Sequence, residues 1–286
     1  MYLFKYICIE PIRINTYYNI LNFLLYTSSF ITVGLLVLIV GFIFVNGIKG
    51  INLNYIFSDY SPSGEGGVLP MIVSTVYMVL ISIGVATPVG ILSAIYLHEY
   101  AKKGRIVEII RFATECLAGI PSIIYGLFGG IFFVVTLKLQ YSILSGALTV
   151  AIIILPVIIR TTEEALKTVP NEYREGSLAM GATKFQTLYK VILPSALPGI
   201  LSGVILSIGR VIGESAAILL TAGTVASMPS SIFDSARTLT VHSYLLTKEM
   251  GDIKGSATVG VVLIIIVLIL NTTAKMIAKK LSKGNI

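Results

Sequence analysis

Two opposite charges stand four residues apart in an apolar stretch of this 286-residue chain. Arg210 and Glu214 lie within residues 208–217, and their spacing would place them on one face of a helix, where they can pair. If that stretch crosses a membrane, an unpaired charge there costs at least about 2.5–3.5 kcal/mol. Such residues usually face the interior of a helix bundle or an aqueous pathway, which makes this pair a candidate site.

The chemistry available to this pair is anion binding. The planar donors of an arginine match the oxygens of phosphate, so Arg210 would supply the positive charge, and Glu214 would hold and orient it. Gly209 and Gly213 would let a substrate or another helix approach closely. The alternative is a purely structural ion pair that fixes helix packing, and the pattern alone leaves both open.

A second candidate site is the polar segment 160–194. Pro170 suits the first turn of a helix, Gly181 can close that helix, and another helix is expected from about Thr183. Between Pro170 and Gly181, charged residues alternate with apolar ones such as Tyr173. A short helix of this composition suits docking into a groove on a soluble partner.

The same segment contains a misleading glycine pattern. Gly176, four residues and Gly181 resemble the start of a phosphate-binding loop, but Ala182 stands where that motif requires lysine, and no strand is expected before it. We therefore expect no ATP hydrolysis and no enzymatic activity by this chain itself.

The elements that must position these residues are membrane helices. The chain is 55% hydrophobic and only 12% charged, whereas a soluble domain is about a quarter charged. A spanning helix needs about 20 mostly apolar residues. Six stretches qualify: 24–45, 71–97, 112–137, 143–159, 198–220 and 258–270, the last extending at most to 276. The predicted fold is all-α, a polytopic protein with six transmembrane helices.

The domain organisation follows from these spans. We expect a cytoplasmic N-terminal segment at 1–23, one membrane domain at 24–276 that includes the loop 160–194, and a cytoplasmic tail at 277–286. The first span is too long for a cleaved signal peptide and has no cleavage site after it, so it should remain as a helix.

The distribution of basic residues predicts the orientation. Of the 21 lysines and arginines, fifteen fall in one set of loops and five in the other, while Arg210 lies within a span. The richer set should face the cytoplasm, which places both termini there. The external stretch 223–257 is long and could include a short surface helix near residues 239–246.

Cysteine and histidine offer little chemistry. Cys8 and Cys116 are far apart and read as free thiols, while His98 and His242 lie in different loops. We therefore expect no metal site and no cofactor bound by this chain.

The segment 160–194 resembles the cytoplasmic signature of ABC importer permeases: Glu-Ala-Ala, three residues, Gly, nine residues, Ile, one residue, Leu-Pro. The matching positions are Glu175, Gly176, Ser177, Gly181, Val191, Leu193 and Pro194. Gly176 and Ser177 replace the two alanines, and Val191 replaces the isoleucine. In that family the short helix sits in a cleft of a cytoplasmic ATPase subunit and transmits its closure, so the resemblance implies this role for residues 173–181.

A finer resemblance comes from the charged span. Gly209, Arg210, Gly213 and Glu214 match a Gly-Arg-x-x-Gly-Glu run found in the membrane subunits of phosphate importers. Further similar stretches are residues 94–101, 119–129, 160–166 and 238–242. Together they resemble PstA-type permeases over roughly residues 68–280, with the MetI-like permease fold.

This resemblance implies the partners and the activity. They are a second, similar permease subunit, two copies of an ATPase subunit that uses the ATP, an extracytoplasmic phosphate-binding protein and the lipid bilayer, with no nucleic acid. The implied activity is ATP-driven import of inorganic phosphate by alternating access in a cell membrane. Import of another oxyanion, molybdate or sulfate, is the first alternative. A secondary transporter or channel is the second, although it would not need a docking signature.

Overall fold

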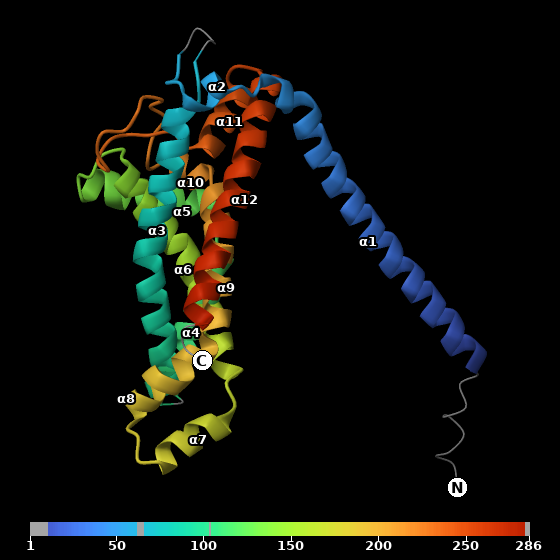
Figure 1. The fold of residues 1–286 in the computed structure, drawn as a ribbon, viewed down its shortest axis with the longest axis vertical. Coiled ribbons are helices and arrows are strands. Elements are labelled where there is room, and N and C mark those ends of the chain that lie inside the picture. The colour runs from blue at the N-terminus through green and yellow to red at the C-terminus, as the bar shows by residue number, and fades with distance from the viewer. Residues whose placement is uncertain (1–10, 62–65, 103, 284–286) are drawn as a thin grey trace.

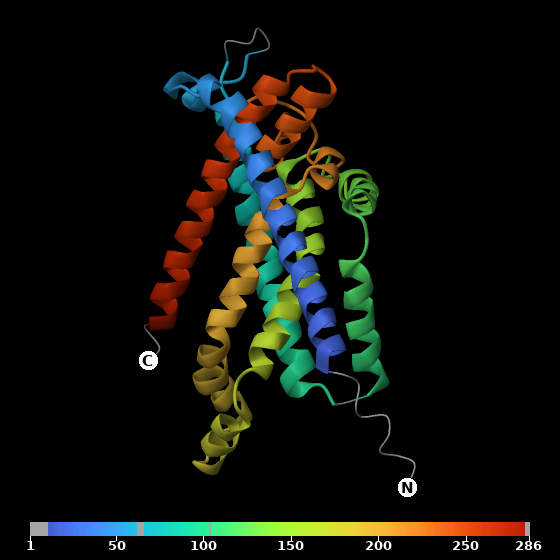
Figure 2. The ribbon, with the colours of Figure 1, turned by 90° about the vertical axis from the view of Figure 1, so that its right-hand side faces the viewer.

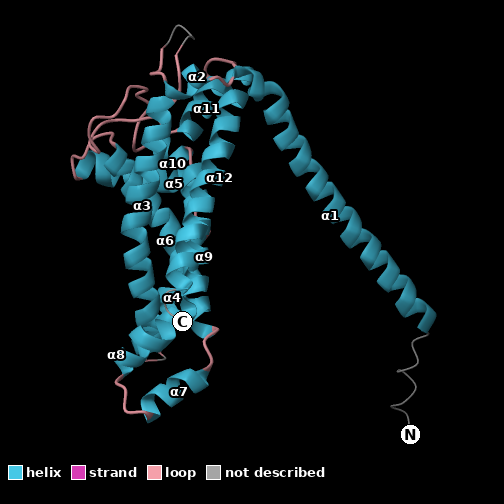
Figure 3. Ribbon diagram, in the orientation of Figure 1, coloured by secondary structure: helices cyan, strands magenta, loops and turns pink. Residues whose placement is uncertain are grey.

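The computed structural model describes residues 11–61, 66–102 and 104–283, and the regular elements in these ranges are all helices (Figure 3). The all-α prediction is therefore confirmed. Five helical segments are each long and apolar enough to cross a membrane: Tyr18–Gly50, Leu69–Tyr100, Ile143–Lys167, Lys184–Gly213 and Ile253–Lys280. They contain helices α1 (Pro11–Gly47), α3 (Leu69–Ile95), α6 (Ile143–Lys167), α9 (Leu193–Gly213) and α12 (Ile253–Lys283).

The sixth candidate span is not straight. Helices α4 (Arg105–Ala118) and α5 (Ser122–Gly129), the latter extended by a π-helical turn at Gly130–Thr136, meet at an angle of 101°. The prediction of one continuous helix at 112–137 is wrong, because Pro121 lacks an N–H for the helical ladder and disfavours helical geometry in the residue before it. Figure 2 shows α4 along the bundle and α5 nearly end-on.

The fifth predicted span begins and ends earlier than expected. Helix α8 (Lys184–Thr187) continues through a π-helical turn at Leu188–Ile192 into α9, which ends at Gly213 rather than near residue 220. A separate short helix, α10 (Ala216–Leu219), follows. The helix is therefore broken at residues 214–215, inside the stretch that the sequence predicted as one membrane helix.

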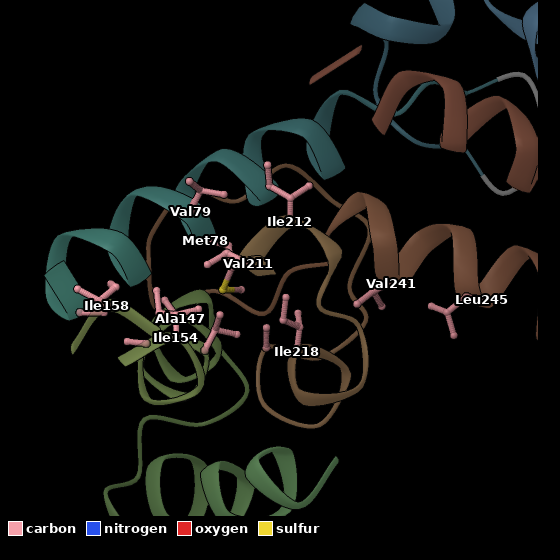
Figure 4. Close-up of a cluster of buried hydrophobic side chains, with 14 residues drawn as sticks. Met78, Val79, Ala147, Ile154, Ile158, Val211, Ile212, Ile218, Val241 and Leu245 are labelled. Atoms are coloured by element: carbon pink, nitrogen blue, oxygen red, sulfur yellow. The ribbon is translucent and has the colours of Figure 1, made fainter. Parts of the chain in front are cut away.

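The core lies where α3, α6 and α9 meet α11 (Leu239–Lys248), the short helix expected in the external segment (Figure 4). Met78, Ile154, Val211 and Leu245 are buried there. Because lipid chains are as apolar as these side chains, close packing holds such helices together. A Cβ added at Gly199 of α9 would lie 2.6 Å from the Cβ of Ala165 in α6, so these two backbones approach closely.

Helix α1 leaves the body of the molecule at an angle. The C-terminal end of α1 contacts the N-terminal part of α12 (Figure 1). A Cβ at Gly47 would meet the backbone of Ala257, and Tyr26 and Phe30 further along are 77% and 80% exposed. Most of α1 therefore presents apolar side chains outward from this chain.

The two ends of the bundle differ. The short helix α7 (Asn171–Ala179) lies at one end, while α2 (Leu53–Phe57) and α11 lie at the other (Figure 1). Residues 11–23 and 277–283, expected as a terminal segment and a tail, continue α1 and α12, and residues 1–10 and 284–286 lie outside the described residues. The first turns of α1 and the last turns of α12 point toward the α7 end (Figure 1).

Candidate functional site

Arg210 lies on an exposed stripe of α9. Every third or fourth residue along one side of this helix is exposed: Ser195, Pro198, Gly199, Ser202, Leu206, Arg210 and Gly213. The opposite side packs into the bundle through residues such as Ile200, Ser207 and Val211. Arg210 therefore projects from a side of α9 that is exposed within the described part of the chain.

Glu214 does not pair with Arg210. Helix α9 ends at Gly213, and Glu214 has an extended backbone, so the i, i+4 relation that the sequence predicted is lost. Its carboxylate instead accepts the backbone N–H of Ala217 at 3.2 Å, at the start of α10. Among the described residues, no carboxylate oxygen lies within 4 Å of the Arg210 guanidinium, and the expectation of a local ion pair is wrong.

The C-terminal end of α9 is held by a hydrogen bond from α11, and there is open space beside its glycines. The Thr240 hydroxyl of α11 donates to the Ile212 carbonyl at 2.5 Å and so satisfies one of the last carbonyls of α9. A Cβ added at Gly209 or Gly213 would meet nothing within 4 Å. The structure therefore places Gly209, Arg210 and Gly213 together at an uncovered helix end, with Glu214 turned away to α10.

Arg160 lines a groove beside the same helix, and the sequence reasoning did not select it as a site residue. A groove of about 550 Å³ runs between α6 and α9, and it is lined by Arg160, Thr161 and Glu164 and by Gly199, Ser202 and Leu206 among others. Arg160 is 3.9 Å from Glu115 of α4. Leu206 and Arg210 are one helical turn apart, about 6 Å along the axis, so the groove leads toward Arg210.

The loop 160–194 folds as its breakers predicted. Helix α7 begins directly after Pro170 and ends at Ala179; the residue after its C-cap, Gly181, is left-handed with φ of +85°. The N–H of Gly181 bonds to Leu178 O at 3.0 Å, and the N–H of Ala182 bonds to Ser177 O at 3.2 Å, which together form a Schellman motif. Gly181 therefore closes the helix, as the sequence predicted, in a conformation that disfavours a Cβ.

Several of the predicted docking residues line one groove, whereas Glu175, Gly181 and Leu193 do not line it. Tyr173, Glu175 and Gly176 are exposed on α7, whereas Leu193 and Pro194 form the half-buried first turn of α9. A groove of about 830 Å³ lies between the two helices, and its lining includes Tyr173, Gly176, Ser177, Met180 and Pro194. This arrangement offers a short helix with exposed apolar and acidic groups beside an open groove.

Two side chains of α7 hold it in place: Arg174, which the sequence reasoning did not select, and Ser177, which it selected as a signature residue. Arg174 pairs with Glu99 at 2.9 Å, and the Ser177 hydroxyl lies 2.9 Å from that of Thr187. Glu99 falls within the stretch 94–101 that supported the family resemblance. That resemblance was the one feature of the sequence that could have pointed to Glu99.

At the opposite end, His242 of α11 is buried beside Arg237. Arg237 donates from Nη1 to His242 Nδ1 at 3.2 Å and from Nε to Thr224 O at 2.9 Å. Burial, and secondarily the charge of Arg237, lowers the pKa of His242 to about 4, so it is neutral near pH 7. Among the described residues, no group of three or more His, Cys, Asp or Glu side chains is placed to hold a metal ion.

Known membrane transport proteins are similar to this chain in sequence. A family model described as "Binding-protein-dependent transport system inner membrane component" matches residues 86–284. The chain is 34% identical over 273 residues to the probable ABC transporter permease protein YqgI of Bacillus subtilis, covering 88% of this chain and 93% of that protein. It is 36% identical over 231 residues to the phosphate transport system permease protein PstA of Pasteurella multocida, covering 75% and 82%.

The fold is also that of a solved transporter. A chain of the MetNI methionine ABC transporter in an inward-facing conformation aligns with a TM-score of 0.61 at 21% identity, covering 73% of this chain and 94% of that one. The likeness at this identity concerns the fold, and it agrees with the predicted MetI-like arrangement.

Proposed function

Because the chain belongs to the family of binding-protein-dependent transport system inner-membrane components, we propose that it is the permease subunit of an ATP-driven importer of inorganic phosphate. The observation that carries the substrate is the similarity, over most of the chain, to proteins named as phosphate transport permeases. The uncovered cationic face of α9 supports it, since Arg210 presents a planar donor set suited to phosphate oxygens.

The translocation pathway in this proposal is formed by two permeases. The stripe of α9 that ends at Arg210 is uncovered in the single chain, so this chain supplies half of the pathway and a second, similar permease supplies the other half. A site enclosed between the two permeases would hold little water, and an interaction between guanidinium and phosphate would be stronger there than in bulk solvent. Gly209 and Gly213 leave room for the anion beside the helix backbone.

The energy in this proposal comes from partner subunits. The loop 160–194 docks one of two ATPase subunits through α7, and an extracytoplasmic phosphate-binding protein delivers the anion at the opposite end. ATP binding closes the ATPases, which pull the α7 helices, and the bundle opens outward; hydrolysis resets it inward. The protein lies in the cell membrane with both termini in the cytoplasm, and it binds no cofactor of its own.

Phosphate uptake in cells that lack this chain tests the proposal. Initial rates of radiolabelled phosphate uptake should fall when the chain is deleted and return when it is supplied with its partners. Excess sulfate or molybdate should not compete. A complex that takes up sulfate or molybdate while ignoring phosphate would overturn the substrate assignment, and uptake that is insensitive to ATPase inactivation would overturn the ATP-driven mechanism.

A further inference from the structure

The docking helix α7 is mostly exposed and buries little of its surface against the membrane domain. All of its residues are exposed except Arg174 and Ser177, which are one helical turn apart and only partly buried. No apolar side chain of α7 is buried. In the described part of the chain, Arg174 and Ser177 are the two α7 residues whose side chains bond to other elements.

Arg174 contacts more elements of the bundle than Ser177 does. Its Nη2 lies 2.9 Å from the Glu99 carboxylate, in the π-helical turn that ends α3, and 3.1 Å from the Leu166 carbonyl, in the last turn of α6. One guanidinium therefore bridges α7 to two membrane helices. Ser177, by contrast, reaches only Thr187 of α8, which is close in the sequence.

The ion pair is shielded from solvent. The side chains of Arg174 and Glu99 are 22% and 16% exposed, and His98 Nδ1 lies 3.0 Å from the same carboxylate oxygen. Charge-assisted hydrogen bonds are strong in such an environment, and they depend on geometry. The nearby pair of Lys167 and Glu164, at 2.7 Å, is 47% and 63% exposed, and a pair so exposed contributes little.

The two helices that receive these contacts pack closely against each other. The Ser82 hydroxyl of α3 donates to the Ala147 carbonyl of α6 at 3.0 Å, and a Cβ added at Gly90 would lie 2.7 Å from Ile158 Cγ2. Helix α6 in turn packs directly against α9, where Gly199 faces Ala165. A displacement of α3 and α6 would therefore reach the helix that carries Arg210 through this packing.

We propose that the Arg174–Glu99 ion pair is the mechanical link that carries movement of α7 into α3 and α6. The proposal rests on the proposed function, because it takes α7 as the helix that docks the ATPase. Arg174 is a positioning residue, which touches neither the transported anion nor the ATP. Its removal should separate ATP hydrolysis from transport while the ATPase stays bound.

Neutral substitutions test this link in the assembled complex. Arg174→Gln and Glu99→Gln should each leave the ATPase co-purifying and hydrolysing ATP, while phosphate transported per ATP falls about tenfold, within the range typical of coupling between sites. Lys167→Gln is the matched control, because it removes a neighbouring charge from an exposed pair, and its ratio should stay within about twofold of wild type.

Two further measurements separate transmission from folding and from substrate choice. The exchange Arg174→Glu with Glu99→Arg should recover part of the lost ratio, since the pair is rebuilt with its ends reversed. In a background without the native cysteines, thiol labelling at Ser202→Cys on the uncovered face of α9 should change when ATP and vanadate trap the complex. That change should disappear in Arg174→Gln, whatever the transported anion is.

The outcomes are distinct. Normal coupling together with a normal labelling change in Arg174→Gln would overturn the link. Loss of the ATPase from Arg174→Gln, with recovery in the charge exchange, would also overturn it, because the pair would then serve docking rather than transmission. If the unmutated complex takes up no phosphate but labelling changes only while Arg174 is present, the link stands and the phosphate assignment fails.

Discussion

Replacing Arg210 by glutamine tests whether this residue binds the anion or supports the fold. In the structure Arg210 is exposed, and among the described residues no carboxylate lies within ion-pair distance of it. Removing one partner of a buried ion pair costs about 3–5 kcal/mol, because the other charge is left unpaired. That penalty does not arise here, so Arg210→Gln should change the stability by no more than about 0.5 kcal/mol, as at other surface sites.

The expected loss of transport is larger. A hydrogen bond to a charged group contributes about 1.5–3 kcal/mol, and each 1.4 kcal/mol corresponds to tenfold. Arg210→Gln should therefore lower the rate of phosphate uptake on the order of 10- to 100-fold at limiting phosphate. Arg210→Lys keeps the charge but loses the planar fork, so it should recover only part of the rate.

The assay combines two readouts from the same cells. Immunoblotting of membranes reports how much assembled protein is present, and initial rates of phosphate uptake report function. Arg105→Gln serves as the matched control: it removes an exposed arginine at the start of α4 that makes no ion pair within the described part of the chain. Its uptake should equal that of wild type.

A double variant gives the decisive result. If Arg210 and Glu214 formed a structural pair in the assembled complex, the single changes would lower the protein level, and Arg210→Gln with Glu214→Gln would restore both level and transport. The structure predicts instead that the double variant is assembled and inactive. Substantial uptake by the double variant would refute the pathway role of Arg210.

Three further predictions concern other parts of the chain. In a cysteine-free background, an impermeant thiol reagent should label Lys248→Cys and not Lys184→Cys in intact cells; labelling at position 184 would contradict the orientation. Gly181→Val should insert normally but transport poorly, because a residue with a side chain at φ of +85° costs about 1–2 kcal/mol, while Gly181→Asn tolerates this conformation and should retain transport; equal activity of the two would contradict the docking role. His242 binds a proton below pH 6.5 in the unfolded chain and only below about pH 4 in the folded one, so its contribution to the free energy of unfolding in detergent is fully present above pH 6.5 and should fall by up to about 3 kcal/mol toward pH 4. His242→Gln should flatten this pH dependence, and an unchanged profile would show that another group titrates.

Most of the helices could be predicted from the sequence. Within a bilayer, backbone groups must be satisfied internally, and about 20 apolar residues match the length of a spanning helix, so the runs at 71–97, 143–159 and 258–270 predict helices. The breakers around α7 were equally informative, because Pro170 and Gly181 act through local backbone geometry that depends little on the rest of the fold. The exposed face of α7 followed from the same local pattern.

The tertiary structure alone decided which charged side chains meet. Arg210 and Glu214 would share a helix face only if the helix continued, but Thr240, 28 residues beyond Ile212, caps the end of α9, and Glu214 bonds to the next helix instead. Arg174 meets Glu99 across 75 residues of sequence because α3 and α6 pack in a register that returns both ends to α7. Spacing in the sequence fixes relations within one helix, whereas contacts between helices depend on packing and on the position where each helix ends.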